Sequence, residues 1–165
     1  MESHFSLDDL DLRLLGQLQT DASLSNQALA ERMGVSPATC LRRVRRLLGS
    51  GLIERQVALV RPERLAQLQG HGLTAIAEVS LDRQGAEHLQ AFEARAVAEG
   101  AVQQCWLVSP GPDFVLVVHV PDMPAYLQLT QRLFTQDANV RNVRAFFATR
   151  RAKFEPKLDL GVVQQ

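Results

Sequence analysis

Four arginines stand within five consecutive positions of this chain: Arg42, Arg43, Arg45 and Arg46. Guanidinium groups bind anions well, because each offers five N–H donors in a planar fork that fits a carboxylate, a phosphate or the edge of a guanine base. The whole chain of 165 residues carries 18 basic and 18 acidic side chains, so its formal net charge is zero. An anionic partner must therefore be met by a local patch rather than by a global field.

The element that carries these arginines is predicted to be a helix that begins at Ser36 and Pro37. Serine caps free N–H groups at a helix start, and proline suits the first helical position because it has no N–H to leave unpaired. At helical spacing one face is apolar and the arginines lie opposite it or beside it. The apolar face comprises Cys40, Leu41, Val44, Leu47 and Leu48. The sequence thus predicts an exposed basic stripe.

Two shorter helical patterns come before the basic helix. The first begins with a capping box formed by Ser6 and Asp9 and ends near Thr20, and the second begins at Ser25 and ends at Gly34. Two helices, a tight glycine turn and a basic third helix predict a helix-turn-helix, whose last helix enters the DNA major groove. The alternative is a merely solvated charged face. The absence of acidic residues from the stripe favours DNA.

The contacts with DNA can be assigned by position along the predicted helices. The first turns of the basic helix can reach base edges, and Arg can contact guanine through two hydrogen bonds. The readout candidates are Ser36, Ala38, Thr39 and Arg42. The later arginines are better placed for phosphates, and the start of the second helix can bond the DNA backbone. These phosphate candidates are Arg43, Arg45, Arg46, Asn26 and Gln27. A plain helix cap remains the alternative for Ser36, and an intramolecular ion pair for Arg43.

The next segment predicts a connector between two domains. Ile53, Val57 and Leu59 fall at odd positions, as on a strand, and "RPERLAQLQGHG" indicates a turn or a short helix followed by glycines. We therefore expect a helix-turn-helix domain over residues 1–51, a β connector or hinge over 52–72, and a second domain over 73–165.

The second domain alternates between strand and helix patterns. Strands are predicted at 73–81, 102–109, 114–120 and 140–153, with helices at 84–98 and 123–136. The order βαββαβ predicts a ferredoxin-like α+β domain. Two helices cover only one face of such a sheet, and the strands "WLV" and "FVLVV" are apolar. We expect a second copy of the chain to cover the open face, which makes a homodimer the minimum assembly.

Other kinds of chemistry find little support in the sequence. Cys40 and Cys105 are far apart, and the four histidines have no metal-binding spacing, so no metal, cofactor or catalytic group is assigned. Cys40, Trp106 and Phe146 are expected in the core. No apolar run approaches the roughly 18 residues of a membrane span, and no leader is evident at the N-terminus. We expect a cytoplasmic protein with no membrane partner.

Particular residues of this chain resemble those of the Lrp/AsnC family, the feast/famine transcription regulators. They are Leu7, Asp11, Leu15, Ala30, Gly34, Ser36, Arg43, Val44, Leu47, Gly51 and Ile53, with "VSPGPDF", "VPDM" and "VRAFFA" downstream. The resemblance implies a winged-helix-like helix-turn-helix domain that binds double-stranded DNA. It also implies a ligand-responsive βαββαβ domain that dimerises and often assembles into higher oligomers.

The resemblance further implies an effector site at the loop "SPGPDF", where the family binds a small molecule, typically an amino acid. Asp113 matches the family's acidic position, and the expected site comprises Leu107, Ser109, Gly111, Asp113, Phe114, Met123, Phe146, Phe147 and Ala148. The chain departs from the family at Pro110, where glycine is usual, and this proline removes a backbone donor. Arg144 or Arg150 could supply a donor instead. The apolar side chains among these residues form the expected wall of the site and predict an apolar amino acid as the ligand. The alternative to an effector site is a rigid turn that packs the dimer.

Two other classes of function stay open at this point. Siroheme decarboxylases resemble this family in fold, so an enzyme of that kind is the alternative to a regulator, although the intact arginine stripe argues against it. A ligand-binding or assembly module without DNA binding is the other class. The N-terminal helices argue against that reading.

Overall fold

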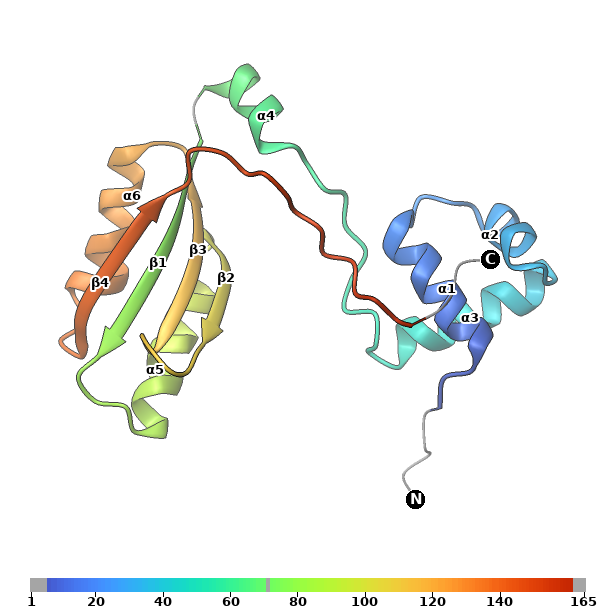
Figure 1. The fold of residues 1–165 in the computed structure, drawn as a ribbon, viewed down its shortest axis with the longest axis horizontal. Coiled ribbons are helices and arrows are strands. Elements are labelled where there is room, and N and C mark those ends of the chain that lie inside the picture. Colours follow the sequence, from blue (N-terminus) through green and yellow to red (C-terminus); the bar gives the residue numbers. More distant parts are fainter. Residues whose placement is uncertain (1–5, 71, 162–165) are drawn as a thin grey trace. The chain divides into compact units, whose positions relative to one another are not determined.

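The computed structural model describes residues 6–70 and 72–161, which fall into two compact units. Unit 1 contains residues 6–59 together with the C-terminal segment 153–161, and unit 2 contains residues 60–152. Both units are drawn in Figure 1. The expected second domain ran from residue 73 to the end of the chain. The structure instead groups its last described residues, from Lys153 onward, with the N-terminal helices.

Unit 1 is built from three helices: α1 (Asp9–Thr20), α2 (Asn26–Met33) and α3 (Pro37–Gly49). The end of α1 agrees with the sequence, but the capping box predicted at Ser6 and Asp9 is wrong. Asp8 caps the helix instead: its side chain accepts from the Asp11 N–H at 3.0 Å, and the Asp11 carboxylate accepts from the Asp8 N–H at 3.1 Å. The same three-residue spacing occurs at both places, but the reciprocal bonds are made by Asp8 and Asp11.

The predicted starts of the other two helices are confirmed. Ser25 accepts from the Ala28 N–H at 3.2 Å, and Ser36 accepts from the Thr39 N–H at 3.2 Å. Gly34 ends α2 in the left-handed region at φ 70°, which glycine adopts without steric cost. The apolar sides of the helices form one small core, built by Leu14, Leu15, Leu29, Ala30, Cys40 and Leu47. Cys40 is thus a core residue, as expected.

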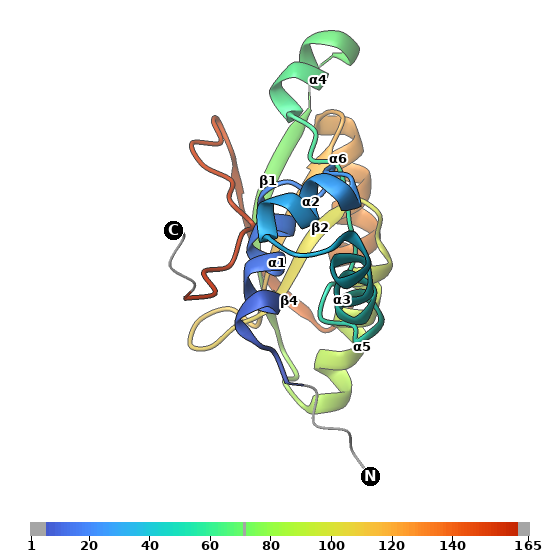
Figure 2. The same cartoon turned by 90° about the vertical axis from the view of Figure 1, so that its right-hand side faces the viewer.

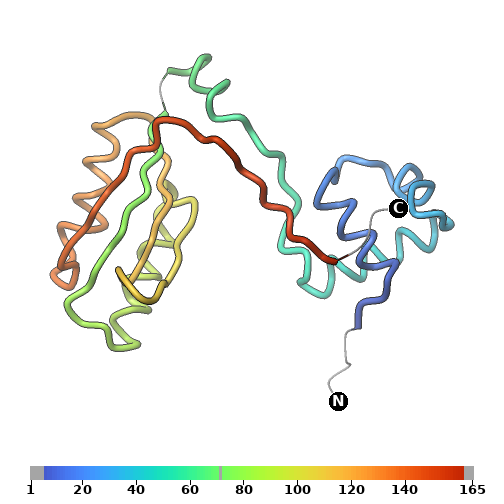
Figure 3. The backbone as a smooth tube through the Cα atoms, in the orientation of Figure 1, coloured from blue at the N-terminus to red at the C-terminus, as the bar shows by residue number. Residues whose placement is uncertain are grey.

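The segment after α3 runs as extended chain, as Figure 3 shows. The β connector expected over residues 52–72 does not form in the single chain: residues 54–61 lie in no strand, and Val57, Leu59 and Val60 remain exposed. An alternating pattern forms a strand only where another strand can pair with it, and the described residues of unit 1 contain no strand. A short helix follows, α4 (Pro62–Gln69). The sequence predicted either a turn or a short helix there.

Unit 2 has the predicted βαββαβ order. Its elements are β1 (Leu73–Leu81), α5 (Ala86–Ala98), β2 (Val102–Leu107), β3 (Phe114–Val120), α6 (Met123–Thr130), the π-helical turn η1 (Gln131–Thr135) and β4 (Val140–Phe147). The four strands form an antiparallel sheet in the order β2-β3-β1-β4. The last strand ends six residues before the predicted limit, because the chain leaves the sheet after Phe147 and continues to unit 1.

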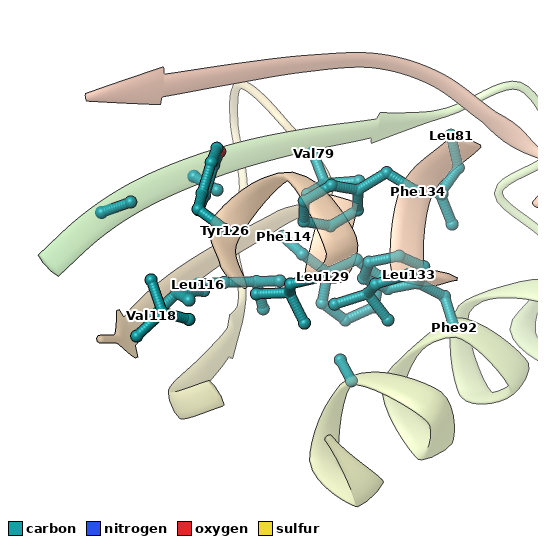
Figure 4. Packing of buried hydrophobic residues seen from close by; sticks show 14 residues of the cluster. Val79, Leu81, Phe92, Phe114, Leu116, Val118, Tyr126, Leu129, Leu133 and Phe134 are labelled. Atoms are coloured by element: carbon teal, nitrogen blue, oxygen red, sulfur yellow. The ribbon is translucent and has the colours of Figure 1, made fainter. Parts of the chain in front are cut away.

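Helices α5 and α6 lie on the same face of the sheet, as Figures 1 and 2 agree. Alternate residues of the central strands point toward them and are buried, including Ala77 and Val79 of β1 and Leu116 and Val118 of β3. Figure 4 shows this core, in which the rings of Phe92 and Phe114 meet with centroids 4.8 Å apart. The core fixes β3 and the loop before it in place.

Among the described residues of unit 2, no helix covers the opposite face of the sheet, and several large apolar side chains there are exposed. Ile76, Trp106 and Phe146 are 41%, 58% and 47% exposed. The expectation that Trp106 and Phe146 are core residues is therefore wrong for the single chain. The period of a strand shows that a residue points to one face, but it does not show whether that face is covered.

Candidate nucleic-acid interface

The outer surface of α3 presents two unpaired arginines. Arg42 and Arg45 are exposed, and neither forms an ion pair with any described residue. Ser36 and Ala38, at the start of the helix, are also exposed, and Thr39 is half-buried. The first three turns of α3 therefore form a basic surface with small residues at its N-terminal end. This is the arrangement that can approach base edges and phosphates together.

The other two arginines of α3 are held by carboxylates of α1. Arg43 donates to Asp8 at 2.5 Å and to Asp11 at 3.0 Å, and Arg46 donates to the other oxygen of Asp11. Arg46 also donates to the backbone carbonyl of Ser6 at 3.3 Å. The intramolecular ion pair left open for Arg43 is therefore present. These ion pairs hold α3 against α1 through the two arginines and the two carboxylates.

Asp11 is the centre of this cluster, and its side chain is fully buried. Burial opposes ionisation, but hydrogen bonds from Arg46, from the Asp8 backbone and from Arg43 outweigh that penalty and lower the pKa of Asp11 from 3.8 to about 2. The Arg43 guanidinium is the main cause that lowers the pKa of Asp8. Both carboxylates are thus held in the charged form that the arginines need.

These contacts separate the predicted phosphate contacts into two groups. Arg43 is turned inward, so that its Nε is buried and has no partner among the described residues. Arg46 is partly exposed but already bonds a buried carboxylate. A phosphate would have to compete with Asp11 for either group, whereas Arg42 and Arg45 meet no such competitor.

The remaining predicted DNA contacts have local bonds of their own. Ser36 bonds both the N–H and the hydroxyl of Thr39, the latter at 2.9 Å, so it is a helix cap. Asn26 donates to the backbone carbonyl of Pro37 at 2.9 Å and thereby joins α2 to the start of α3. Gln27 donates to Glu31 at 3.3 Å along its own helix. The hydrogen bond of Gln27 is the easiest of the three to exchange for a contact with DNA, because both Gln27 and Glu31 are exposed.

Sequence reasoning missed the role of Asp8 and Asp11 as partners of the α3 arginines. The signal was present in the sequence, because Asp11 lies within the apolar stripe of α1, between Leu10 and Leu14. A carboxylate at a core position must be paired, since burying an unpaired charge is costly. The sequence could have predicted a cationic partner, although not which one.

The loop expected to hold an effector is tied to the end of β1. Asp113 accepts from the Leu81 N–H at 2.6 Å, its own N–H donates to the Val79 carbonyl at 2.9 Å, and its carbonyl accepts from the Val108 N–H at 3.0 Å. The Asp113 N–H, a backbone donor that a ligand carboxylate could have used, is therefore already bonded. Asp113 shapes the turn, as the alternative interpretation of this loop supposed.

The apolar wall expected around the effector does not form one surface in the single chain. Phe146 pairs with Ile76 on the open face, whereas Phe147 pairs with the buried Ala75 and its ring packs against Tyr126 on the helix side, 5.0 Å between centroids. Phe114 is fully buried in the core of unit 2 and cannot line an accessible pocket without movement. The exposed members are Leu107, Ser109, Gly111, Met123, Phe147 and Ala148, with Phe146 on the open face.

Neither of the two arginines considered as donors has a hydrogen bond to the loop among the described residues. Arg144 of β4 donates to Glu78 of β1 at 2.9 Å and stacks on the ring of Phe146 at 5.2 Å, all on the open face. Arg150 is exposed beyond the end of β4. The structure thus brings Arg144 together with Phe146, two residues that the sequence analysis considered for the same site.

Comparison with known proteins places both units in one family. A model of the AsnC-type helix-turn-helix domain matches residues 7–48, and a model of the Lrp/AsnC ligand binding domain matches residues 74–158. The chain belongs to the Lrp/AsnC family. It is a helix-turn-helix transcriptional regulator of the Lrp/AsnC type, with a DNA-binding domain and a ligand-binding domain.

Curated relatives of the Lrp/AsnC family match over nearly the whole length. The leucine-responsive regulatory protein of Rhizobium meliloti is 35% identical over 147 residues, which cover 89% of this chain and 92% of that protein. The protein of the same name from Salmonella typhimurium is 34% identical over 152 residues, 92% of this chain and 90% of the relative.

Solved structures of the family agree in fold. An AsnC family transcriptional regulator from Agrobacterium tumefaciens superposes with a TM-score of 0.82 at 28% identity, covering 94% of this chain and 98% of that one. A transcriptional regulator from Neisseria meningitidis, solved as a complex with L-Met, gives a TM-score of 0.80 at 28% identity and covers 94% and 97%. In the part of this chain that the structure describes, no helix is both long and apolar enough to span a membrane.

Proposed function

We propose that this Lrp/AsnC regulator reads DNA with the outer surface of α3. Arg42 contacts a base edge, and Arg45 contacts a phosphate, with Ala38 and Thr39 beside them. The observation that carries this assignment is the contrast on one helix between arginines held by buried carboxylates and arginines that meet none. Arg43 and Arg46 orient the helix, and DNA recognition rests on their unpaired neighbours. The proposed location is the cytoplasm, since a transcription regulator acts where its DNA is.

We propose further that two chains pair through the open face of the sheet. Exposed apolar side chains on a sheet face without helices favour burial against another surface. The face also carries the Glu78–Arg144 pair. A homodimer places two α3 helices on one DNA duplex, so that the operator is a pseudo-palindrome with half-sites one or more helical turns apart. Higher assemblies are built from this dimer.

The proposed effector is an apolar amino acid bound between subunits at the loop of residues 109–113. The single chain offers only part of a wall there, because Phe114 and Phe147 face the helix side. The second subunit completes the site, and the Neisseria relative bound to L-Met supports the choice of ligand class. One oxygen of Asp113 bonds Leu81, so the other is the acceptor for the ligand ammonium. Occupancy shifts the assembly and through it the affinity for DNA.

The experiment that tests the regulator is selection of genomic fragments bound by the purified protein, repeated with each of the twenty amino acids. Enriched fragments with a shared two-fold motif support the proposal, and a change of enrichment with an apolar amino acid supports the effector. Light scattering of the same samples must show at least a dimer. A monomer at micromolar concentration, or fragments without a common motif, contradicts the proposal.

A further inference from the structure

The C-terminal segment 153–161 follows the last strand of unit 2 in sequence, yet its contacts lie on α1 of unit 1. We call these residues the strap. The amide of Gln19 clamps the backbone of Leu158 on both sides: the Leu158 N–H donates to Gln19 at 2.8 Å, and Gln19 donates to the Leu158 carbonyl at 3.2 Å. Lys157 donates to the Thr20 hydroxyl at 3.0 Å. The end of the ligand-binding domain is thus anchored on the DNA-binding domain.

An apolar contact supports these polar ones. Leu160 is half-buried and packs against the core of unit 1, whereas the side chain of Leu158 is 69% exposed. The strap also shapes its own backbone, because Glu155 accepts from the Lys157 N–H at 3.1 Å and Asp159 accepts from the Gly161 N–H at 2.9 Å. Bonds of this kind reduce the conformational freedom that docking has to remove.

The docking is not a tightly packed interface. A cavity of about 1050 Å³ remains open between α1, α2 and the strap. It is lined by apolar residues and by charges of both signs, among them Arg13, Arg32 and Asp159. The half-buried Leu160 and the exposed hydrogen bonds each contribute a modest free energy, so the strap can leave and return without unfolding the helices.

The place of docking connects the strap to the DNA-binding helix through α1. Thr20, whose hydroxyl accepts a hydrogen bond from Lys157, lies about two and a half turns after Asp11. It therefore points to the opposite side of the helix. Asp11 holds Arg43 and Arg46 of α3. Helix α1 therefore carries the strap on one side and the arginine pair on the other.

We propose that the strap is a second, reversible tether that sets how freely each DNA-binding unit moves relative to its ligand-binding domain. Residues 52–59 alone are an extended, largely exposed linker. With the strap docked, unit 2 is joined to unit 1 at both of its ends, and fewer orientations of α3 are accessible. In the dimer of the proposed function, on which this inference rests, the restriction selects operators of one half-site spacing. Undocking relaxes that selection.

The test uses the full-length chain and two undocking variants, Gln19→Ala and Leu160→Ala. Leu158→Ala is the matched control, because it lies in the same strap and removes an exposed side chain while keeping the backbone bonds. Hydrogen exchange without DNA measures the protection of the strap peptide. We expect protection in the wild type and in the control, and its loss in both undocking variants. Absence of protection in the wild type shows that the strap does not dock and overturns the proposal.

The second measurement is retardation of duplexes that carry two half-sites at spacings varied in single base pairs over one helical turn. We expect the wild type and the control to prefer one spacing, and the undocking variants to lower the ratio of best to worst affinity by roughly tenfold. A mere loss of stability would weaken binding at every spacing alike. That outcome, or an unchanged profile despite lost protection, overturns the proposal.

The two measurements also keep the proposals apart. If the wild-type protein retards no duplex, the proposed function fails and the spacing selection fails with it, while hydrogen exchange still shows whether the strap docks. If the wild type binds DNA and both undocking variants keep the spacing preference of the Leu158→Ala control, the proposed function stands and the tether is wrong.

Discussion

The inner and outer arginines of α3 differ in what surrounds them, although they alternate within five residues. Arg43 and Arg46 bond the carboxylates of Asp8 and Asp11 across to α1, and Arg43 is mostly buried. Arg42 and Arg45 are exposed and meet no carboxylate among the described residues. The four arginines of α3 therefore have two different roles. The inner pair holds the helix in the domain, and the outer pair is available to DNA.

The comparison teaches that charge density along a sequence overstates the size of a binding surface. A buried carboxylate such as Asp11 neutralises part of the positive field that the four arginines would otherwise direct to solvent. Their common helix nevertheless benefits from both groups, because recognition requires that α3 keep its angle in the domain. Experiments that treat the two pairs separately can break or sharpen this division.

The largest effect is expected from Asp11→Ala. Removing the carboxylate deprives Arg43 and Arg46 of the fully buried acceptor that they share, and breaking a buried ion pair costs about 3–5 kcal/mol. Hydrogen exchange of α1 and α3 in the full-length protein measures the loss in unit 1, and the amides of unit 2 serve as an internal reference. The matched control is Asp9→Ala, which removes an exposed carboxylate from the same helix. Equal destabilisation by both variants would contradict a structural role of Asp11.

Acid is expected to have the next largest effect on unit 1. The pKa of Asp11 is lowered from 3.8 to about 2 in the folded protein, so its contribution to stability is present above the unfolded value. That contribution, about 2 kcal/mol, disappears as the pH falls through the folded value. Denaturation followed from pH 5 to pH 2 should show the wild type approaching Asp11→Asn. A difference between the two proteins that stays constant over this range argues against the assignment.

Substitution of the outer arginines is expected to act on DNA rather than on folding. Arg42→Ala should cost roughly 1–3 kcal/mol of binding free energy and relax specificity at one base position. Arg45→Ala should weaken all sequences alike and lower the salt slope by about one phosphate contact. Retardation assays at several salt concentrations measure both. If Arg43→Ala lowers the slope as much as Arg45→Ala does while its unfolding is unchanged, the inner and outer groups are not distinct.

The smallest effect is expected from a surface ion pair of unit 2. Arg132 bonds Glu99 through two nitrogens at 3.1 and 3.3 Å, and neither side chain of this pair is buried as Asp11 is. Exposed pairs contribute about 0–1 kcal/mol, so Arg132→Ala should barely change the free energy of unfolding measured in denaturant. A loss as large as that of Asp11→Ala would show that burial is not what separates the two kinds of pair.

Most helices and strands could be predicted because their limits depend on local chemistry. Ser25, Ser36 and Gly34 mark helix ends through caps and a positive φ that act within a few residues. Strand β1 and the order of elements in unit 2 follow from patterns that persist over whole segments. The pattern at Ile53, Val57 and Leu59 looked equally regular but lacked a partner strand, so it formed none.

The candidate sites were less predictable because they depend on pairs distant in sequence. The basic surface of α3 was expected as a whole, and its division required the position of α1. The effector wall was assembled from residues that share a motif, yet Phe146 and Phe147 are neighbours on a strand and so point to opposite faces. Asp113 was recognised as important, but its bond to Leu81 depends on how the loop meets β1.

The sequence by itself determined the family, the helix-turn-helix, the βαββαβ order and the place of the basic helix, because capping, periodicity and motif spacing are properties of short segments. Tertiary structure alone decided which arginines remain available, which apolar residues stay uncovered and where the C-terminal segment lies. These outcomes depend on burial and on which distant groups meet: Asp11 lies more than thirty residues from Arg43, and Gln19 lies 139 residues from Leu158. A linear pattern records residue types and intervals, whereas desolvation and ion pairing are set by distances in space.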